Sequence, residues 1–395
     1  MAKIEFAGAN EGSFQAAARA LEVIGELRVS TKHVQRITER LGRERQEERD
    51  AAVEAFKKRT LKPSYSQFPR VAAVHLDAGK IQLRQEDGQP GVKDPHWGDT
   101  KVGCFLTYAA PADDGDPQPL PPAAFVDRSR VARLCREMER IGGRLPEGEE
   151  SSCEEIMAKA DNDVGEKSWH PTRLVRTAVA TMRDSEAFGW MVAAEAGMRG
   201  FYRAKARAVV GDGGNWIGPL GEMHFPGWKQ ILDFLHLLVH LYAAAIAAYR
   251  GRGKMAWKRY ESWVRSAWAG EVDKVIEGLE AECRRLGPVP AGAGQDDARK
   301  VVSLTLEYVK ANAGRMDYAN YRRAGLPITS APVESLIKQF NKRVKGTEKF
   351  WVSGGAESIL QSRAAYLSED GRASEFYKHR PRGKAVGRGR LRASA

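Results

Sequence analysis

The central part of the chain alternates between short apolar runs and longer stretches in which apolar residues recur at helical spacing. Short apolar runs predict strands, and a recurrence of three or four residues predicts helices. The predicted strands are 71–84, 102–109, 174–182, 206–211 and 228–233. Helical patterns occupy 185–199, a short stretch after Asp212, and a long stretch that runs through Tyr249. This order predicts an α/β fold.

The N-terminal region has a helical composition, with apolar positions in two blocks. The first block contains Phe14, Ala17, Ala18, Leu21, Ile24 and Leu27, and the second contains Val34, Ile37 and Leu41. Ser30 and Thr31 supply a helix start between the blocks. Two such helices could form a helix-turn-helix reader of DNA, with Lys32, Gln35 and Arg36 early on the second helix. The alternative is a helical hairpin whose polar face is merely solvated.

Two interruptions divide the chain. Residues 111–172 begin with a stretch rich in proline and aspartate, contain a helical pattern near 131–141 and continue as an acidic loop. We expect an insertion or mobile connector there, with carboxylates that are ordinary solvated charge. Residues 250–325 are helical and rich in tryptophan, which predicts an all-α insertion with most of these rings in its core. The expected parts are an N-terminal helical DNA-binding region at 1–65, a core at 66–249 and 326–376 that contains the connector, the all-α insertion at 250–325, and a basic flexible tail at 377–395.

Charge indicates the kind of partner. Lysine and arginine number 63 against 51 acidic residues, so the net charge is +12, and the excess is concentrated toward the C-terminus. A polyanion is the expected partner, and the basic tail is expected to be disordered until it meets phosphate. Charge alone also fits RNA or an acidic membrane surface.

Cysteine usage and hydropathy indicate the cellular compartment of the protein. Cys104, Cys135, Cys153 and Cys283 lie far apart, without a Cys-x-x-Cys pair or a histidine at ligand spacing, so they are expected to be reduced thiols. No apolar run is long enough to span a bilayer, and the N-terminus lacks the features of a secretory signal. We therefore expect a cytoplasmic, nucleoid-associated protein without a membrane partner.

Three acidic residues stand in settings that favour a shared metal site. Asp77 and Asp212 each close an apolar run, and Glu334 opens a basic helix after Pro332. Carboxylates delivered by strand ends and a helix can converge and hold hard divalent cations, as phosphodiester chemistry requires. Each acid alone also fits a structural role, because Asp-Gly sequences form turns and acids are favoured at helix N-termini. The combination points to catalysis.

The order of these elements fits a ribonuclease H-like core. In such a core a mixed sheet brings an acid on the first strand near an acid after the fourth, and a later helix contributes the third. Two Mg²⁺ ions held in this way can activate an attacking water or 3′-hydroxyl and stabilise the leaving oxygen. Mn²⁺ is the expected substitute.

Longer sequence blocks around the acids carry a resemblance to a known family. The blocks are 209–216, 224–236, 316–335 and 340–351, and together with the block around Asp77 they extend the similarity from residue 12 to residue 372. The chain resembles the Kra-type bacterial insertion-sequence transposases, a DDE group related to the Mutator-like enzymes. The resemblance implies that Asp77, Asp212 and Glu334 bind the catalytic metals.

The family's Asp-x-x-His element falls on Asp233 and His236. The expected role is support of the active site from behind the metal ligands, or a contact that orients DNA. The alternative for His236, which lies on an apolar helix, is a satisfied buried histidine. Related sequences usually have glycine directly after the first acid, where this chain has Ala78.

Basic residues near Glu334 are candidates for DNA contacts. Those after Glu334 follow it at helical spacing and lie on nearly the same face, where they could grip phosphates that flank the metals. The candidates are Lys338, Asn341, Lys342 and Lys345, with Arg322 and Arg323 just upstream. The alternative is a solvated basic face.

These features predict a DNA transposase. It would bind terminal inverted repeats of double-stranded DNA as a homodimer or larger assembly, cleave 3′ ends with a divalent metal and transfer the strands into target DNA. Two alternatives stay open: a non-cutting DNA-binding protein derived from a transposase, and a metal-dependent nuclease without strand transfer.

Overall fold

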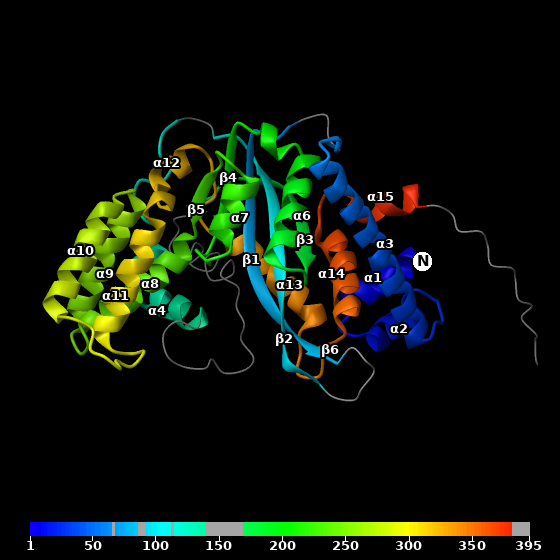
Figure 1. Ribbon diagram of the computed structural model, residues 1–395, viewed down its shortest axis with the longest axis horizontal. Helices are drawn as coiled ribbons and strands as arrows, with labels where there is room; N and C mark the ends of the chain where they lie inside the picture. Colours follow the sequence, from blue (N-terminus) through cyan, green and yellow to red (C-terminus); the bar gives the residue numbers. More distant parts are fainter. Residues whose placement is uncertain (65–67, 86–91, 112–113, 139–168, 381–395) are drawn as a thin grey trace, which may run out of the picture.

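The computed structural model describes residues 1–64, 68–85, 92–111, 114–138 and 169–380 (Figure 1). At its centre lies a mixed sheet with the strand order β3-β2-β1-β4-β5, and β6 also pairs with β1. The strands are β1 (Val71–Arg84), β2 (Val92–Tyr108), β3 (Arg173–Thr181), β4 (Ala206–Gly211), β5 (Lys229–Leu232) and β6 (Phe350–Trp351).

The strand directions make the sheet an open mixed one. β1 runs antiparallel to β2 and parallel to β4, β2 is antiparallel to β3, and β4 is parallel to β5. The predicted α/β class is therefore confirmed. β1 and β4 have the predicted bounds, but β2 begins ten residues earlier than predicted. Residues 92–101 of β2 pair with residues 78–84 of β1. Residues 92–101 include many polar residues, so they lack the apolar pattern that predicts a strand.

Helices cover both faces of the sheet. The first six residues of β1 are all buried, and alternate residues point into two separate hydrophobic cores. One core contains α6 (Ser185–Met198) and α7 (Ile217–His224), and the other contains α8 (Phe234–Ala248), α13 (Ala331–Val344) and α14 (Ser353–Leu367). The sheet is thus the middle layer of three, as Figure 1 shows.

The residues between α8 and α13 are helical, as predicted. They form α9 (Gly253–Trp268), α10 (Val272–Leu286), α11 (Ala298–Asn312) and the short α12 (Tyr318–Arg323). Trp263 and Trp268 are buried in this part, which also agrees with the prediction. Among the described residues, no helix is both long and apolar enough to cross a membrane.

The described part of the predicted connector is anchored to these helices. It contains η1 (Ala123–Phe125) and α4 (Arg128–Glu137), which begins three residues before the predicted helical stretch. The Tyr260 hydroxyl donates to the Phe125 carbonyl at 3.0 Å, and the Trp268 indole donates to the Gln118 carbonyl at 2.8 Å. The acidic loop falls largely on 139–168, outside the described residues.

Two predictions fail at Arg322, which is fully buried. Its Nε and Nη2 donate to the Asp116 carboxylate at 2.9 and 2.6 Å, and its guanidinium carbon lies 4.1 Å from the centroid of the Trp268 ring. Arg322 therefore cannot reach a DNA phosphate as predicted. Asp116, in the connector, is likewise the partner of a buried cation and not ordinary solvated charge.

The N-terminal region forms three helices where two were predicted. They are α1 (Ala2–Asn10), α2 (Phe14–Val23) and α3 (Thr31–Lys57). The predicted start at Ser30 is confirmed, because its hydroxyl accepts the His33 N–H at 3.2 Å. Lys32 and Arg36 are exposed on the first turns of α3, and Gln35 donates to Glu39 at 2.8 Å. α3 then packs along α14 and α6 (Figure 1).

Glu5 ties the two ends of the chain together. Its carboxylate is fully buried and accepts the Nε and Nη2 of Arg45 on α3 at 2.8 and 3.0 Å. It also accepts the hydroxyls of Ser362 and Tyr366 on α14, and of Tyr377 on α15 (Arg372–His379). α15 thus extends into the predicted tail, and the rest of that tail, 381–395, lies outside the described residues.

We predict that Glu5→Ala lowers the free energy of unfolding by about 3–5 kcal/mol, because it leaves the buried Arg45 guanidinium without its carboxylate. Chemical denaturation measures this loss.

Glu22→Ala is the matched control on the neighbouring helix α2. Glu22 pairs with Arg28 at 3.3 Å on the surface, so its removal should cost about 1 kcal/mol or less. Equal losses in the two variants would contradict the role given to Glu5.

Candidate functional site

Adjacent parallel strands deliver the first two predicted acids to the same place. The register pairs His75 of β1 with Val210 of β4, and Asp77 and Asp212 each lie two residues further on. Neighbouring strands run about 4.8 Å apart, so these two carboxylates leave the sheet side by side.

The loop after β4 is held in one conformation. The Asp212 carboxylate accepts the Gly214 N–H at 2.9 Å, which makes a local turn. Gly213 has a φ of 84°, and a side chain there would meet Leu232 and Tyr308. The Tyr308 hydroxyl, from α11, donates to the Asp212 carbonyl at 2.9 Å. The helical part between α8 and α13 therefore helps to position the second acid.

The third acid, Glu334, lies in the first turn of α13. Pro332 in the same turn suits a helix start, and the Ser330 hydroxyl donates to a Glu334 carboxylate oxygen at 2.7 Å. One turn after Glu334, the Ile337 side chain lies 3.4 Å from the position of a Cβ on Gly79. α13 therefore packs against β1 beside Asp77.

The three acids lie near enough to one another to interact. Burial first, and then the charges of Asp212 and Glu334, raise the pKa of the Asp77 carboxyl to about 7. The Ala78 N–H, which donates to Asp77 at 2.6 Å, and the nearby His236 act in the opposite direction. The structure therefore brings the three predicted carboxylates together.

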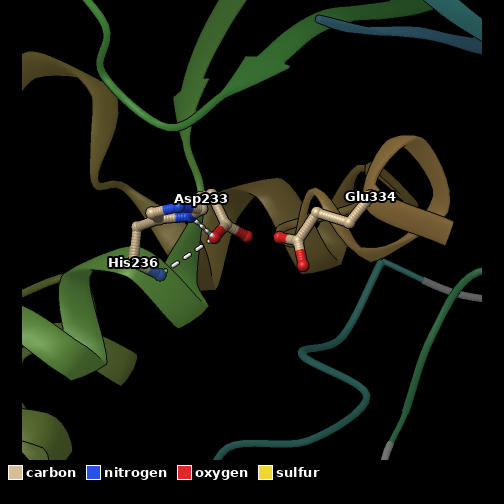
Figure 2. Close-up of side chains that lie close together, drawn as sticks. All are labelled: Asp233, His236 and Glu334. Atoms are coloured by element: carbon tan, nitrogen blue, oxygen red, sulfur yellow. Dashed lines mark hydrogen bonds and ion pairs between the residues drawn. The ribbon is translucent and has the colours of Figure 1, made fainter. Parts of the chain in front are cut away.

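Asp233 lies at the junction of β5 and α8 and is fully buried. One carboxylate oxygen accepts the backbone N–H of His236 at 2.9 Å and its ring Nδ1 at 2.5 Å (Figure 2). The other oxygen accepts the Ser330 N–H at 2.6 Å, and the Asp233 N–H donates to the Gly211 carbonyl at 2.8 Å. Asp233 thus fixes β4, α8 and the start of α13 to one another.

His236 is a cation at neutral pH. Burial lowers the pKa of its imidazole, but the hydrogen bond and charge of Asp233, together with the charges of Glu334 and Asp212, raise it to about 9. In Figure 2 the Asp233 carboxylate lies between the ring and Glu334, and ligand atoms of the three residues lie within 4.8 Å of one another. His236 is therefore a half-buried histidine whose Nδ1 is satisfied by Asp233, as the alternative expects, and it also lies beside the acidic cluster.

Two overlapping sets of residues are candidates for holding a metal ion, and they differ in how closely their ligand atoms approach. Among the described residues, ligand atoms of Asp233, His236 and Glu334 lie within 4.8 Å of one another, whereas those of Asp77, Asp212 and Glu334 do not come that close. However, both Asp233 oxygens already accept hydrogen bonds, and the hydrogen bond and charge of Asp233 raise the pKa of the His236 imidazole to about 9. The second set offers only the carboxylate oxygens that Mg²⁺ prefers, and a divalent cation there would offset the charges that add to burial in raising the pKa of Asp77.

The remaining basic candidates lie on two helices. Lys338, one turn after Glu334 on α13, and Asn341 are half-buried, whereas Lys342 and Lys345 are exposed. Arg323 on α12 is exposed and donates to Asn320 at 2.9 Å.

The sequence analysis does not identify two residues of the site. Ser330 is one of them, although a serine four residues before Glu334 at a helix start is a usable signal. Tyr308 carries no such signal, since it reaches the site only through the packing of α11.

Comparisons of the chain with models of known protein families and with curated proteins give no match. Membership of a transposase family therefore stays a prediction, and the functional argument depends on the site itself.

We predict that Asp77 makes the metal-free protein less stable as the pH rises. A carboxyl whose pKa is raised in the folded state binds a proton more tightly there than in the unfolded chain, so the free energy of unfolding falls between about pH 4 and pH 7. Asp77→Asn should match the wild type at pH 4 and exceed it by roughly 2–4 kcal/mol at pH 8. Denaturant unfolding without divalent cations measures both values.

The assignment would be contradicted if the free energies of unfolding of Asp77→Asn and the wild type differed by the same amount at pH 4 and at pH 8. Asp273→Asn, a change at an exposed acid on α10, is the control and should follow the wild type at both values.

We predict that the His236 imidazole titrates near pH 9 and that Asp233→Asn lowers this midpoint by at least about one pH unit, because burial then acts without the carboxylate partner. NMR of the imidazole ring measures the midpoint. If it is the same in Asp233→Asn as in the wild type, another group holds the proton.

Proposed function

We propose that the protein is a DDE transposase of an insertion sequence, with an RNase H-like catalytic core. The observation that carries the proposal is the convergence of Asp77 in the middle of β1, Asp212 directly after β4 and Glu334 in the first turn of α13, which are far apart in the sequence. The sequence blocks that resemble Kra-type transposases surround these same acids and support the same assignment.

The sheet supports the RNase H-like core. β1 occupies the centre, with the antiparallel β2 and β3 on one side and the parallel β4 and β5 on the other. The first acid lies on the central strand, the second follows its parallel neighbour, and the third lies on a helix packed across β1. This arrangement agrees with the order of acids from which the core was predicted.

Asp77, Asp212 and Glu334 would hold two Mg²⁺ ions, with Mn²⁺ as a substitute. When bound, the ions supply activation of the attacking oxygen and stabilisation of the leaving oxygen of a phosphodiester. The raised pKa of Asp77 fits this use, since a carboxylate cluster strained by its own repulsion gains most from a cation.

Other residues position the acids and the substrate. The Ser330 hydroxyl holds one oxygen of Glu334, so the carboxylate keeps a fixed orientation. Asp233 keeps His236 protonated, and the imidazolium beside the acids can attract a DNA phosphate that they alone would repel. In this proposal Asp233 and His236 act as positioning and charge-balancing residues.

Double-stranded DNA is the proposed substrate, comprising the ends of the element and the target. Lys338 and Lys342 on α13, and Lys345 directly after it, would contact phosphates beside the cleaved bond. Lys32 and Arg36, exposed on α3, are the proposed contacts of the N-terminal helices. Because two ends are joined in one reaction, a homodimer or larger assembly on DNA is part of the proposal.

We predict that the wild-type protein with Mg²⁺ forms joined products from DNA that carries the sequences flanking its coding region. Asp77→Asn, Asp212→Asn and Glu334→Gln should each lower the yield at least about 100-fold, because each removes a proposed ligand of the metals. Gel analysis of the products measures cleavage and joining separately.

Asp273→Asn, at the exposed acid on α10, is the control and should retain full yield. Nicked DNA without joined species would indicate a metal-dependent nuclease instead. Binding without cleavage in Mg²⁺ or Mn²⁺ would indicate a non-cutting DNA-binding protein.

A further inference from the structure

Arg343, in the last turn of α13, is a buried cation without a carboxylate partner. The residue is 2% exposed, and its Nε donates to the Gly8 carbonyl at 2.9 Å. Its Nη2 has no hydrogen-bond partner, and Arg343 forms no ion pair in the described part of the chain. Burial of a charge in this state is costly unless something else compensates it.

Two aromatic rings offset part of this cost. The guanidinium carbon lies 4.6 Å from the centroid of the Phe14 ring and 5.1 Å from that of Trp351. Such contacts stabilise a cation by about 0.5–2 kcal/mol each, less than the desolvation of a guanidinium costs. They also leave the Nη2 donor unsatisfied.

Two further cations surround Arg343. Burial first, and then the charge of the buried Arg363, lower the pKa of Arg343 to about 10. The half-buried Lys349 has its own pKa lowered by burial and by Arg343. The fold therefore concentrates positive charge at this point.

A cavity of about 490 Å³ opens beside these cations. Arg343, Lys349 and the exposed Arg84 of β1 line it, together with Gly12–Phe14 at the N-terminus of the ten-residue helix α2. The first backbone N–H groups of a helix lack partners within the helix and attract anions. Two acids, Glu39 and Glu348, also line the cavity, but Glu39 accepts a hydrogen bond from Gln35 at 2.8 Å and Glu348 is exposed.

We propose that this cavity binds a phosphate group, held by Arg343, Lys349 and the N-terminus of α2. A phosphate in the cavity would lie beside the Arg343 guanidinium and neutralise charge that no carboxylate of the described chain neutralises.

The source we favour is a backbone phosphate of DNA, and this part rests on the proposed function. Glu334 and Arg343 are nine residues apart on α13, roughly 14 Å along the helix axis. A duplex whose cleaved bond lies at Glu334 could therefore place a phosphate in the cavity. Free inorganic phosphate has the same chemistry and is the other source to test.

The first experiment compares melting temperatures in sodium phosphate and in sodium chloride at equal ionic strength. The wild type should melt about 1–2 °C higher in phosphate, because a ligand that binds only the folded state stabilises it. Lys349→Gln should lose this difference, and so should Arg343→Gln if it folds. Lys58→Gln, which removes the same charge from an exposed site directly after α3, should keep this difference.

The second experiment measures binding of a DNA duplex by fluorescence anisotropy at several salt concentrations without divalent cations. Lys349→Gln should weaken binding roughly five-fold and lower the slope of log affinity against log salt by about one, and Lys58→Gln should change neither. A lowered slope assigns the site to DNA, whereas loss of the phosphate response with an unchanged slope assigns it to free phosphate.

The proposal is overturned if Lys349→Gln behaves like Lys58→Gln in both experiments, and Arg343 is then only a cation stacked between two rings. Neither experiment involves cleavage. A failure of the strand-transfer assay would therefore reject the proposed function but not the phosphate site. A failure of both binding experiments would reject the phosphate site but not the proposed function.

Discussion

The buried carboxylate of Asp233 is the constraint on which the site depends. Its hydrogen bonds join the end of β5, the first turn of α8 and the backbone at Ser330, and its own N–H reaches the end of β4. Hydrogen bonds to a charged group contribute about 1.5–3 kcal/mol each when buried. Because Ser330 in turn holds Glu334, the position of the third acid relative to the sheet follows from this one side chain.

Each end of α13 carries a charge imbalance, and the two imbalances have opposite signs. At the first turn the carboxylates of Asp77, Asp212 and Glu334 repel one another, and the Ala78 N–H and His236 oppose the effect on Asp77. At the last turn Arg343 has cations as neighbours and forms no ion pair with a carboxylate in the described part of the chain. A sequence selected only for stability would avoid both arrangements, so local conflicts of this kind are expected where ligands bind. The same helix would then present a cation site and an anion site to one extended polyanionic partner.

The sequence predicts what depends on local pattern. The first six residues of β1 and the last four of β4 are continuously buried, and both strands have the predicted bounds. Asp77 and Asp212 directly follow these buried runs, so the same pattern points to them. What fails depends on long-range pairing: Arg322 looks like a surface cation until Asp116, 206 residues away, meets it in the core. The role of Tyr308 and the two-residue strand β6 could not be predicted for the same reason, because neither has a local sequence pattern that indicates it.

Glu5 makes the order of synthesis matter for this fold. Its partners on α14 and α15 lie more than 350 residues further along the chain, so an emerging N-terminal helix carries an acid whose hydroxyl partners do not yet exist. Asp233 likewise lacks one of its hydrogen-bond donors until Ser330 has been made. α1 therefore cannot complete its contacts, and the three acids cannot assemble, until the segment from α13 to α15 has been made. A product truncated before α13 would retain the strands β1 to β5 and lack Glu334, the third acid of the candidate site.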